Sequence, residues 1–366
     1  LTGFIISIPV FLDVALVILA PLLYALARDT KKSVLVFGLP LVAGMAVTHA
    51  FVPPTPGPVA VAYFLNVNLG YVIGFGVLVG LPTAIICGPF LCSRMAKLVE
   101  VTTPADQGED LTSEEKKLPS FLQIASLIAL PIALILAGTV VEQSAISGID
   151  PGLTKAERNA QVADILNSMP TTNQVIHFLG HPVIALMIST LLAIFFLGIS
   201  RGTSKEDLVE ISTKALGPAG IIILITGAGG VFKGVLIATG IADALKEVFI
   251  GSPIPIIVLA YIFATLVRIA QGSATVAMLT AAGLMASFVE GFTQPYLALI
   301  ACAIAAGATG FSHVNDSGFW MISRYLGMTE KQTLKTWTVI STAISLVSFG
   351  IILILSFFIP MYIEST

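Results

Sequence analysis

Long uncharged stretches are the feature that most constrains how this chain can fold. Hydrophobic residues make up 56% of its 366 residues and charged residues only 11%, whereas a soluble domain carries about 25% charged residues. No single protein core could bury so much apolar surface, so lipid must cover much of it. The composition therefore predicts an all-α polytopic membrane protein.

Composition also bears on partners and cofactors. The net charge is −3 and there is no basic run, so nucleic acid is not an expected partner. Cys87, Cys92 and Cys302 lie in or beside apolar segments, which indicates small core residues and no disulfide framework. We expect no cofactor and no metal. Because the chain opens on Leu1 at the edge of a hydrophobic run, we expect an N-terminally truncated fragment.

One polar stretch, Gly307–Trp320, interrupts the apolar sequence. Within it stand two hydroxyls, an imidazole, an amide and a carboxylate: Ser312, His313, Asn315, Asp316 and Ser317. Polar groups at membrane depth are expensive, so they often mark a binding site or a transport pathway. The alternative interpretation is a helix N-cap, in which Asn, Asp or Ser satisfies free backbone N–H groups.

Two other segments also break the helical pattern. Residues 253–287 are almost wholly apolar but too long for one span of about 20 residues. This predicts a span plus a broken or re-entrant piece, with the polar interruption at Arg268, Gln271, Ser273 and Thr275. The second segment, Val52–Pro58, holds four prolines and cannot lie inside a helix.

The two halves of the chain match each other as a repeat. When residues 1–95 are laid over 261–359, Asp13 falls opposite Ser273, and Thr48-His49 falls opposite Ser312-His313. The loop at 28–32 is basic while its counterpart at 288–294 holds one acid; the loop at 59–70 is uncharged while its counterpart at 324–335 is basic. By the positive-inside rule the halves point in opposite directions. This predicts an inverted-repeat secondary transporter with a site near the bilayer midplane.

The repeat suggests a domain organisation. We expect an incomplete first repeat, a cytoplasmic linker, a connecting span with an external loop, and a second repeat, over residues 1–97, 98–118, 119–173 and 174–366. Single spans are expected at about 4–26 and 174–199.

Several side chains in these segments suit transport chemistry. Arg268 is a fixed positive charge that can grip a carboxylate with two hydrogen bonds. Histidine titrates near neutral pH, and an acid within a span is expensive unless it has a role. The candidates for proton coupling are therefore Asp13, His49, His313 and Asp316. Each also has a structural interpretation, as a cap or a satisfied core group.

Three motifs resemble the gluconate permease family: residues 47–58 (VTHAFVPPTPGP), 268–277 (RIAQGSATVA) and 311–320 (FSHVNDSGFW). The resemblance covers nearly the whole chain. It implies a member of the ion-transporter superfamily in the bacterial inner membrane, with a scaffold, a transport domain and re-entrant hairpins. Such proteins are proton symporters for gluconate and related sugar acids, and one branch carries D-serine. The expected substrate-binding residues are Arg268, Gln271, Gly272, Ser273, Thr275, Ser312, Asn315, Asp316, Ser317 and Thr55.

The sequence therefore predicts a symporter that moves a small gluconate-like organic anion with protons, and not an enzyme. The alternatives are a cation/proton antiporter of the same architecture and a D-serine permease. A membrane-embedded hydrolase or metalloenzyme lacks support, because the chain has neither His-Glu-x-x-His nor Gly-x-Ser-x-Gly. The sequence leaves open whether two copies form a homodimer.

Overall fold

The computed structural model describes residues 1–8, 11–99, 101, 119–146, 155–239, 254–289 and 291–362. Over these ranges every regular element is a helix and none is a strand, which confirms the all-α prediction. The predicted cytoplasmic linker at 98–118 lies almost wholly outside the described residues.

Among the described residues, the first group contains six α-helices and, before the last of them, a π-helix. Ser33 and Asn68 cap α3 and α5, since their side-chain oxygens accept from the backbone N–H groups of Leu35 and Gly70. The elements are α1 (Thr2–Ile6), α2 (Leu12–Thr30), α3 (Val34–Phe51), α4 (Pro56–Leu65), α5 (Leu69–Ile85), the π-helix Ile86–Cys92 and α6 (Ser93–Met95).

The middle group contains the longest helix, α11. Its elements are α7 (Phe121–Ile146), α8 (Lys155–Ser168), α9 (Thr171–Gly180), α10 (Pro182–Ala193), a π-helix (Ile194–Gly198), a 3-10 turn (Ile199–Arg201) and α11 (Lys205–Ala238).

The last group repeats the pattern of short helices separated by brief breaks. Thr293 caps α15, and Thr329 forms a capping box with Gln332 at the start of α17. The elements are α13 (Ile256–Gln271), α14 (Ala274–Met285), α15 (Gln294–Thr309), α16 (Ser317–Tyr325) and α17 (Glu330–Ser356).

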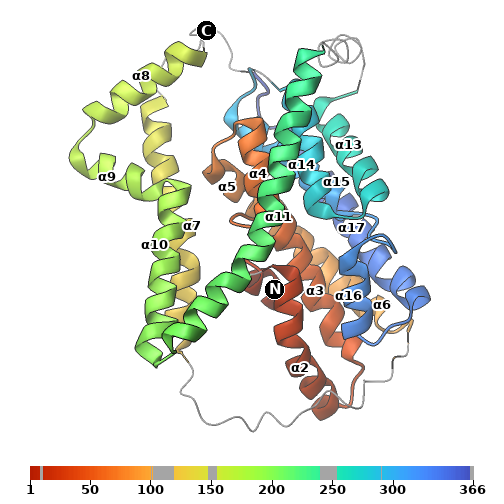
Figure 1. Ribbon diagram of the computed structural model, residues 1–366. Coiled ribbons are helices and arrows are strands. Elements are labelled where there is room, and N and C mark those ends of the chain that lie inside the picture. The colour runs from red at the N-terminus through yellow and green to blue at the C-terminus, as the bar shows by residue number, and fades with distance from the viewer. Residues whose placement is uncertain are drawn as a thin grey trace.

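The helices form two bodies (Figure 1). The larger one contains α1 to α6 and α13 to α17, and the smaller one contains α7 to α10. The long helix α11 crosses in front of the larger body and packs against α14. The helices α5 and α7 make the contact between the bodies.

Helix α15 is the centre of the larger body. Every residue from Tyr296 to Thr309 is buried, and α15 packs against α3, α4, α5, α13, α14 and α17. Small residues allow this close approach: a Cβ on Gly307 would lie 2.4 Å from the carbonyl oxygen of Tyr261 in α13. Membrane helices pack closely in this way because small residues let their backbones meet.

The apolar helices suit a membrane. In the part of the chain that the structure describes, five helical stretches are long and apolar enough to cross one: Val34–Leu65, Leu69–Met95, Leu122–Ala145, Pro182–Arg201 and Glu330–Ser356. Three shorter apolar helices, α13, α14 and α15, accompany them.

Two expected spans are divided. The span expected at about 4–26 is instead a short α1, which ends at Ile6, and a separate α2, which begins at Leu12. The span expected at about 174–199 divides at His181, whose backbone is extended, because Pro182 starts α10 as its first residue. Hydrophobicity alone does not reveal such breaks, since apolar residues stand on both sides of each.

The two glycines near the middle of α5 provide a test of this packing. A Cβ on Gly76 would lie 2.0 Å from the carbonyl oxygen of Phe51, whereas a Cβ on Gly74 would meet nothing within 4 Å. We expect Gly76→Ala to destabilise the protein by about 1 to 3 kcal/mol through overpacking. Gly74→Ala should be neutral or stabilise it by up to about 1 kcal/mol. Thermal unfolding of the purified variants in detergent checks this, and equal melting temperatures would contradict it.

Candidate functional site: two helix breaks joined by a buried ion pair

The first break separates α13 from α14. Gly272 ends α13 in the left-handed conformation, with φ of +77°. Ser273 then caps α14, since its Oγ accepts from the N–H of Val276 over 3.3 Å. A Cβ at position 272 would lie 2.2 Å from the carbonyl oxygen of Asn315. Glycine is therefore required both for its backbone conformation and for the close approach of the second break.

The second break separates α15 from α16. After α15 ends at Thr309, Phe311 adopts a positive φ of 52°, which is unusual for a residue other than glycine. Asp316 caps α16: its Oδ1 accepts from the N–H of Gly318 over 2.9 Å. The N-cap interpretation of Asp316 is thus correct, and it is compatible with a further role.

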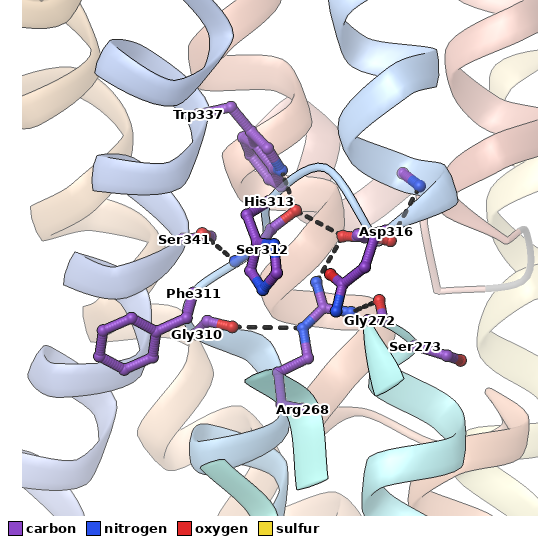
Figure 2. A network of polar contacts seen from close by, with 12 residues as sticks. Arg268, Gly272, Ser273, Gly310, Phe311, Ser312, His313, Asp316, Trp337 and Ser341 are labelled. Atoms are coloured by element: carbon purple, nitrogen blue, oxygen red, sulfur yellow. Dashed lines mark hydrogen bonds and ion pairs between the residues drawn. The ribbon is translucent and has the colours of Figure 1, made fainter. Parts of the chain in front are cut away.

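An ion pair connects the two breaks (Figure 2). Nη2 of Arg268 lies 2.5 Å from Oδ2 of Asp316, and the two residues are only 4% and 9% exposed. Nε of Arg268 donates to the carbonyl of Gly310 over 3.2 Å, and Nη1 donates to the carbonyl of Gly272. Arg268 therefore ties the end of α13 to the end of α15 and to the start of α16. Each of the three guanidinium nitrogens thus donates to a protein group.

The carboxylate of Asp316 is equally well satisfied. It accepts hydrogen bonds from three donors, namely the guanidinium of Arg268, the hydroxyl of Ser312 and the backbone N–H of Gly318. Three donors, one of them cationic, therefore hold this carboxylate in place. Asp316 and Arg268 together form a neutral pair.

Helix α17 holds the second break from outside, through residues that the sequence did not single out. Nε1 of Trp337 donates to Oγ of Ser312 over 2.8 Å, and Thr338 donates to the carbonyl of Ser312 over 2.5 Å. Oγ of Ser341 accepts from the N–H of Ser312 over 3.3 Å, and Oγ1 of Thr342 accepts from the N–H of Phe311 over 3.3 Å. A signal was present, because hydroxyl residues recur at helical spacing along one face of this apolar helix.

Other predicted residues at the two breaks are more exposed than the ion pair. Nδ2 of Asn315 donates to the carbonyl of Ile269 over 2.8 Å, and Nε2 of His313 lies 3.2 Å from the same oxygen. Three of the predicted binding residues are exposed: Gln271, Asn315 and Ser317. His313, Ser273 and Thr275 are half-buried. These polar groups lie close to the ion pair along the chain and are more exposed than it is.

At a third break, between α3 and α4, lie two more of the predicted residues, His49 and Thr55. Thr48 donates to the carbonyl of Phe4 over 2.7 Å, and Thr55 donates to the carbonyls of His49 and Val52 over 3.0 and 2.9 Å. Both hydroxyls thus satisfy backbone groups. Nδ1 of His49 is buried and has no hydrogen-bond partner among the described residues.

The third break meets the first through helix packing. Helix α4 packs against α14, so closely that a Cβ on Gly57 would lie 2.8 Å from Sδ of Met278. In the same way α2 packs against α16. Asp13, in the first turn of α2, lies close enough to Asp316 for the two carboxylates to repel each other. His49 lies near the start of α2 too, since the centroid of its ring is 6.1 Å from that of Phe11, the residue before α2.

The arrangement suits an organic anion. Helix starts present backbone N–H groups and the positive end of the helix dipole, which favour negative charge. Here the starts of α14 and α16 meet beside exposed amide and hydroxyl groups that can hydrogen-bond to a polyol. No group of three or more His, Cys, Asp or Glu residues that could hold a metal ion occurs in the described ranges.

Apolar helices that break at polar, capped turns define a multi-pass membrane transporter. The model of the GntP family of permeases matches residues 1–358, and the chain belongs to that family. This confirms the predicted resemblance, and it makes the protein a transporter rather than an enzyme.

Curated relatives agree with the family assignment. A low-affinity gluconate transporter of Escherichia coli K12 is 36% identical over 349 residues, which cover 95% of this chain and 73% of the relative. A gluconate permease of Bacillus subtilis is 35% identical over 363 residues, which cover 97% of this chain and 77% of the relative. The Gnt-II system L-idonate transporter of Escherichia coli K12 is 32% identical over 349 residues, which cover 94% of this chain and 74% of the relative.

Asp316→Asn tests the ion pair. The substitution keeps the shape of the side chain but leaves the guanidinium of Arg268 buried without a counter-charge. We expect a loss of about 3 to 5 kcal/mol in stability. Ser317→Ala, at the next and exposed position, is the matched control and should change stability by no more than about 0.5 kcal/mol. Chemical unfolding in detergent gives both values, and an Asp316→Asn variant as stable as the control would show that the pair contributes little.

Proposed function

We propose that the protein carries gluconate, or a closely related sugar acid, into the cell across the bacterial cytoplasmic membrane together with protons. The relatives named for gluconate and L-idonate transport support the choice of substrate. The observation that carries the proposal is the pair of helix breaks joined by Arg268 and Asp316, which places exposed polar groups beside helix starts.

We infer that the chain contains an inverted repeat. The order of elements supports it: α1, α2, α3, a break, α4 and α5 in one half correspond to α13, α14, α15, a break, α16 and α17 in the other. Even the turns agree. Asn66 before α5 has a φ of 54° and Gly327 before α17 has a φ of 67°. The opposite charge of the corresponding loops favours opposite orientations in the membrane.

Packing between the halves supports the same inference. Helix α4 of the first half packs against α14 of the second, and α16 of the second half packs against α2 of the first. An exchange of equivalent contacts is what a two-fold axis between the halves would produce. In this class of transporters the substrate lies where the broken helices of the two repeats meet.

We assign the anion to the surface that the exposed and half-buried polar residues of the two breaks form near the ion pair. Asn315, Ser317, Gln271, Thr275 and Ser273 would contact the carboxylate and hydroxyl groups directly. Arg268, Gly272, Ser312 and Asp316 shape this surface from beneath, and Thr55 holds the break of the first half. A sugar acid offers one carboxylate and several hydroxyls, which match helix starts and neutral polar side chains.

Proton coupling is assigned to the titratable groups near the breaks, namely Asp13, His49, His313 and Asp316. Among these, the carboxylates and the sugar acid are all negative when ionised. A proton bound near the substrate would therefore favour binding of the anion, and the anion would favour binding of the proton.

Gluconate uptake into proteoliposomes tests this function. With acid outside, a pH difference of one unit and the membrane potential held at zero, one-to-one coupling should concentrate gluconate about tenfold inside. Excess unlabelled gluconate should abolish uptake of the label, and D-serine should not. Uptake that responds to a sodium gradient but ignores the pH gradient would contradict the proposal.

Asn315 gives a sharper test of the site. Its Nδ2 is engaged by Ile269, which leaves Oδ1 to accept from a substrate hydroxyl. We expect Asn315→Ala to raise the KM for gluconate about 2- to 10-fold, the effect of one neutral hydrogen bond. Asn315→Asp should raise it further, because the new charge repels the anion. Asn167→Ala on α8 is the control, and no difference between these variants would place the substrate elsewhere.

A further inference from the structure

Two carboxylates near the breaks differ sharply in their surroundings. Asp316 accepts from three donors and is paired with Arg268. Asp13, in contrast, has no hydrogen-bond or ion-pair partner among the residues that the structure describes. Its side chain is exposed rather than held.

Helix packing brings these two carboxylates together. Helices α2 and α16 lie side by side, and at one end Oη of Tyr24 donates to the carbonyl of Tyr325 over 2.6 Å. Tyr24 follows Asp13 by eleven residues and Tyr325 follows Asp316 by nine. At about 1.5 Å per residue both segments rise by roughly 14 to 17 Å. Asp13 and Asp316, near the starts of these two segments, lie within electrostatic range of each other, so the starts of α2 and α16 are on the same side of the helix pair.

The charges around the site leave one group uncompensated. Arg268 and Asp316 cancel, so Asp13 contributes a net negative charge next to the proposed anion surface. The other titratable group near this end of α2 is His49 of α3, with His313 at the second break. Arg324 of α16 lies at the far end of that helix, near Tyr325. An arriving sugar acid would meet the charge of Asp13 without a counter-ion.

We propose that Asp13 is the residue that carries the coupled proton, while Asp316 stays paired with Arg268 as a fixed part of the site. This proposal rests on the proposed function and names the residue that binds the coupled proton. A proton from external water binds an oxygen of the Asp13 carboxylate, and the negative charge that repels the substrate is removed. After the site opens inward, the anion leaves, and the O–H bond breaks to return the proton to cytoplasmic water. Repulsion between the ionised Asp13 carboxylate and the substrate anion thus couples the movement of the proton to that of the anion.

Asp13→Asn mimics the protonated state permanently. Because the amide cannot release a proton, we expect a pH gradient of one unit to give an accumulation ratio near one, against about tenfold for the wild type. Exchange of internal for external gluconate at equal pH needs no proton movement and should persist. Asp29→Asn, which removes an exposed acid at the other end of α2, should accumulate gluconate as the wild type does.

Binding measurements keep the proposal testable if Asp13→Asn neither accumulates nor exchanges. The affinity of purified wild type for gluconate should fall as pH rises, and that of Asp13→Asn should not change with pH. A pH gradient that still drives accumulation in Asp13→Asn would overturn the assignment. So would a variant affinity that depends on pH as in the wild type. A wild type that ignores the pH gradient would instead refute proton symport itself.

Discussion

The pairing of Arg268 with Asp316 is the interaction on which the rest of the structure depends. Helices that end within a membrane leave carbonyl groups without partners, and hydrocarbon offers no water to satisfy them. Arg268 donates to the carbonyls of Gly272 and Gly310, which lie at the ends of α13 and α15. A buried guanidinium in turn requires a counter-charge, and Asp316 supplies it while it caps α16. One pair of side chains thus makes two helix breaks stable together.

Small residues and hydroxyls complete this arrangement. Gly272 lets the two breaks touch, because any side chain there would strike the backbone of Asn315. From the other side, Trp337 and Thr338 hold Ser312, whose hydroxyl donates to Asp316. The result is a rigid, electrically neutral base beneath an exposed polar surface. In the proposed function a substrate anion binds to this surface without displacing the pair, and the coupled proton binds to the carboxylate of Asp13.

The sequence predicts the breaks better than it predicts their contacts. Polar residues within an apolar run, such as Gln271–Ser273 and Ser312–Ser317, are expensive in a membrane and so mark interruptions. The pairing of Arg268 with Asp316 could not be predicted, because the two residues lie 48 positions apart and only folding brings them together. Arg268 was therefore expected to grip a substrate carboxylate, and in the structure each of its three nitrogens donates to a protein group. The division of the expected span at His181 and Pro182 was missed because apolar residues stand on both sides of it, although Pro182 was itself a signal for a helix start.

The most direct test of the account is whether gluconate covers the second break. In Asn315→Cys the new thiol would be exposed, while Cys87, Cys92 and Cys302 are buried and give little background. A water-soluble maleimide should label this cysteine in membranes, and saturating gluconate should slow the labelling strongly. Lys331→Cys, exposed beyond α16, should be labelled at the same rate with and without gluconate. Labelling of Asn315→Cys that is unaffected by gluconate would contradict a substrate site at the helix breaks.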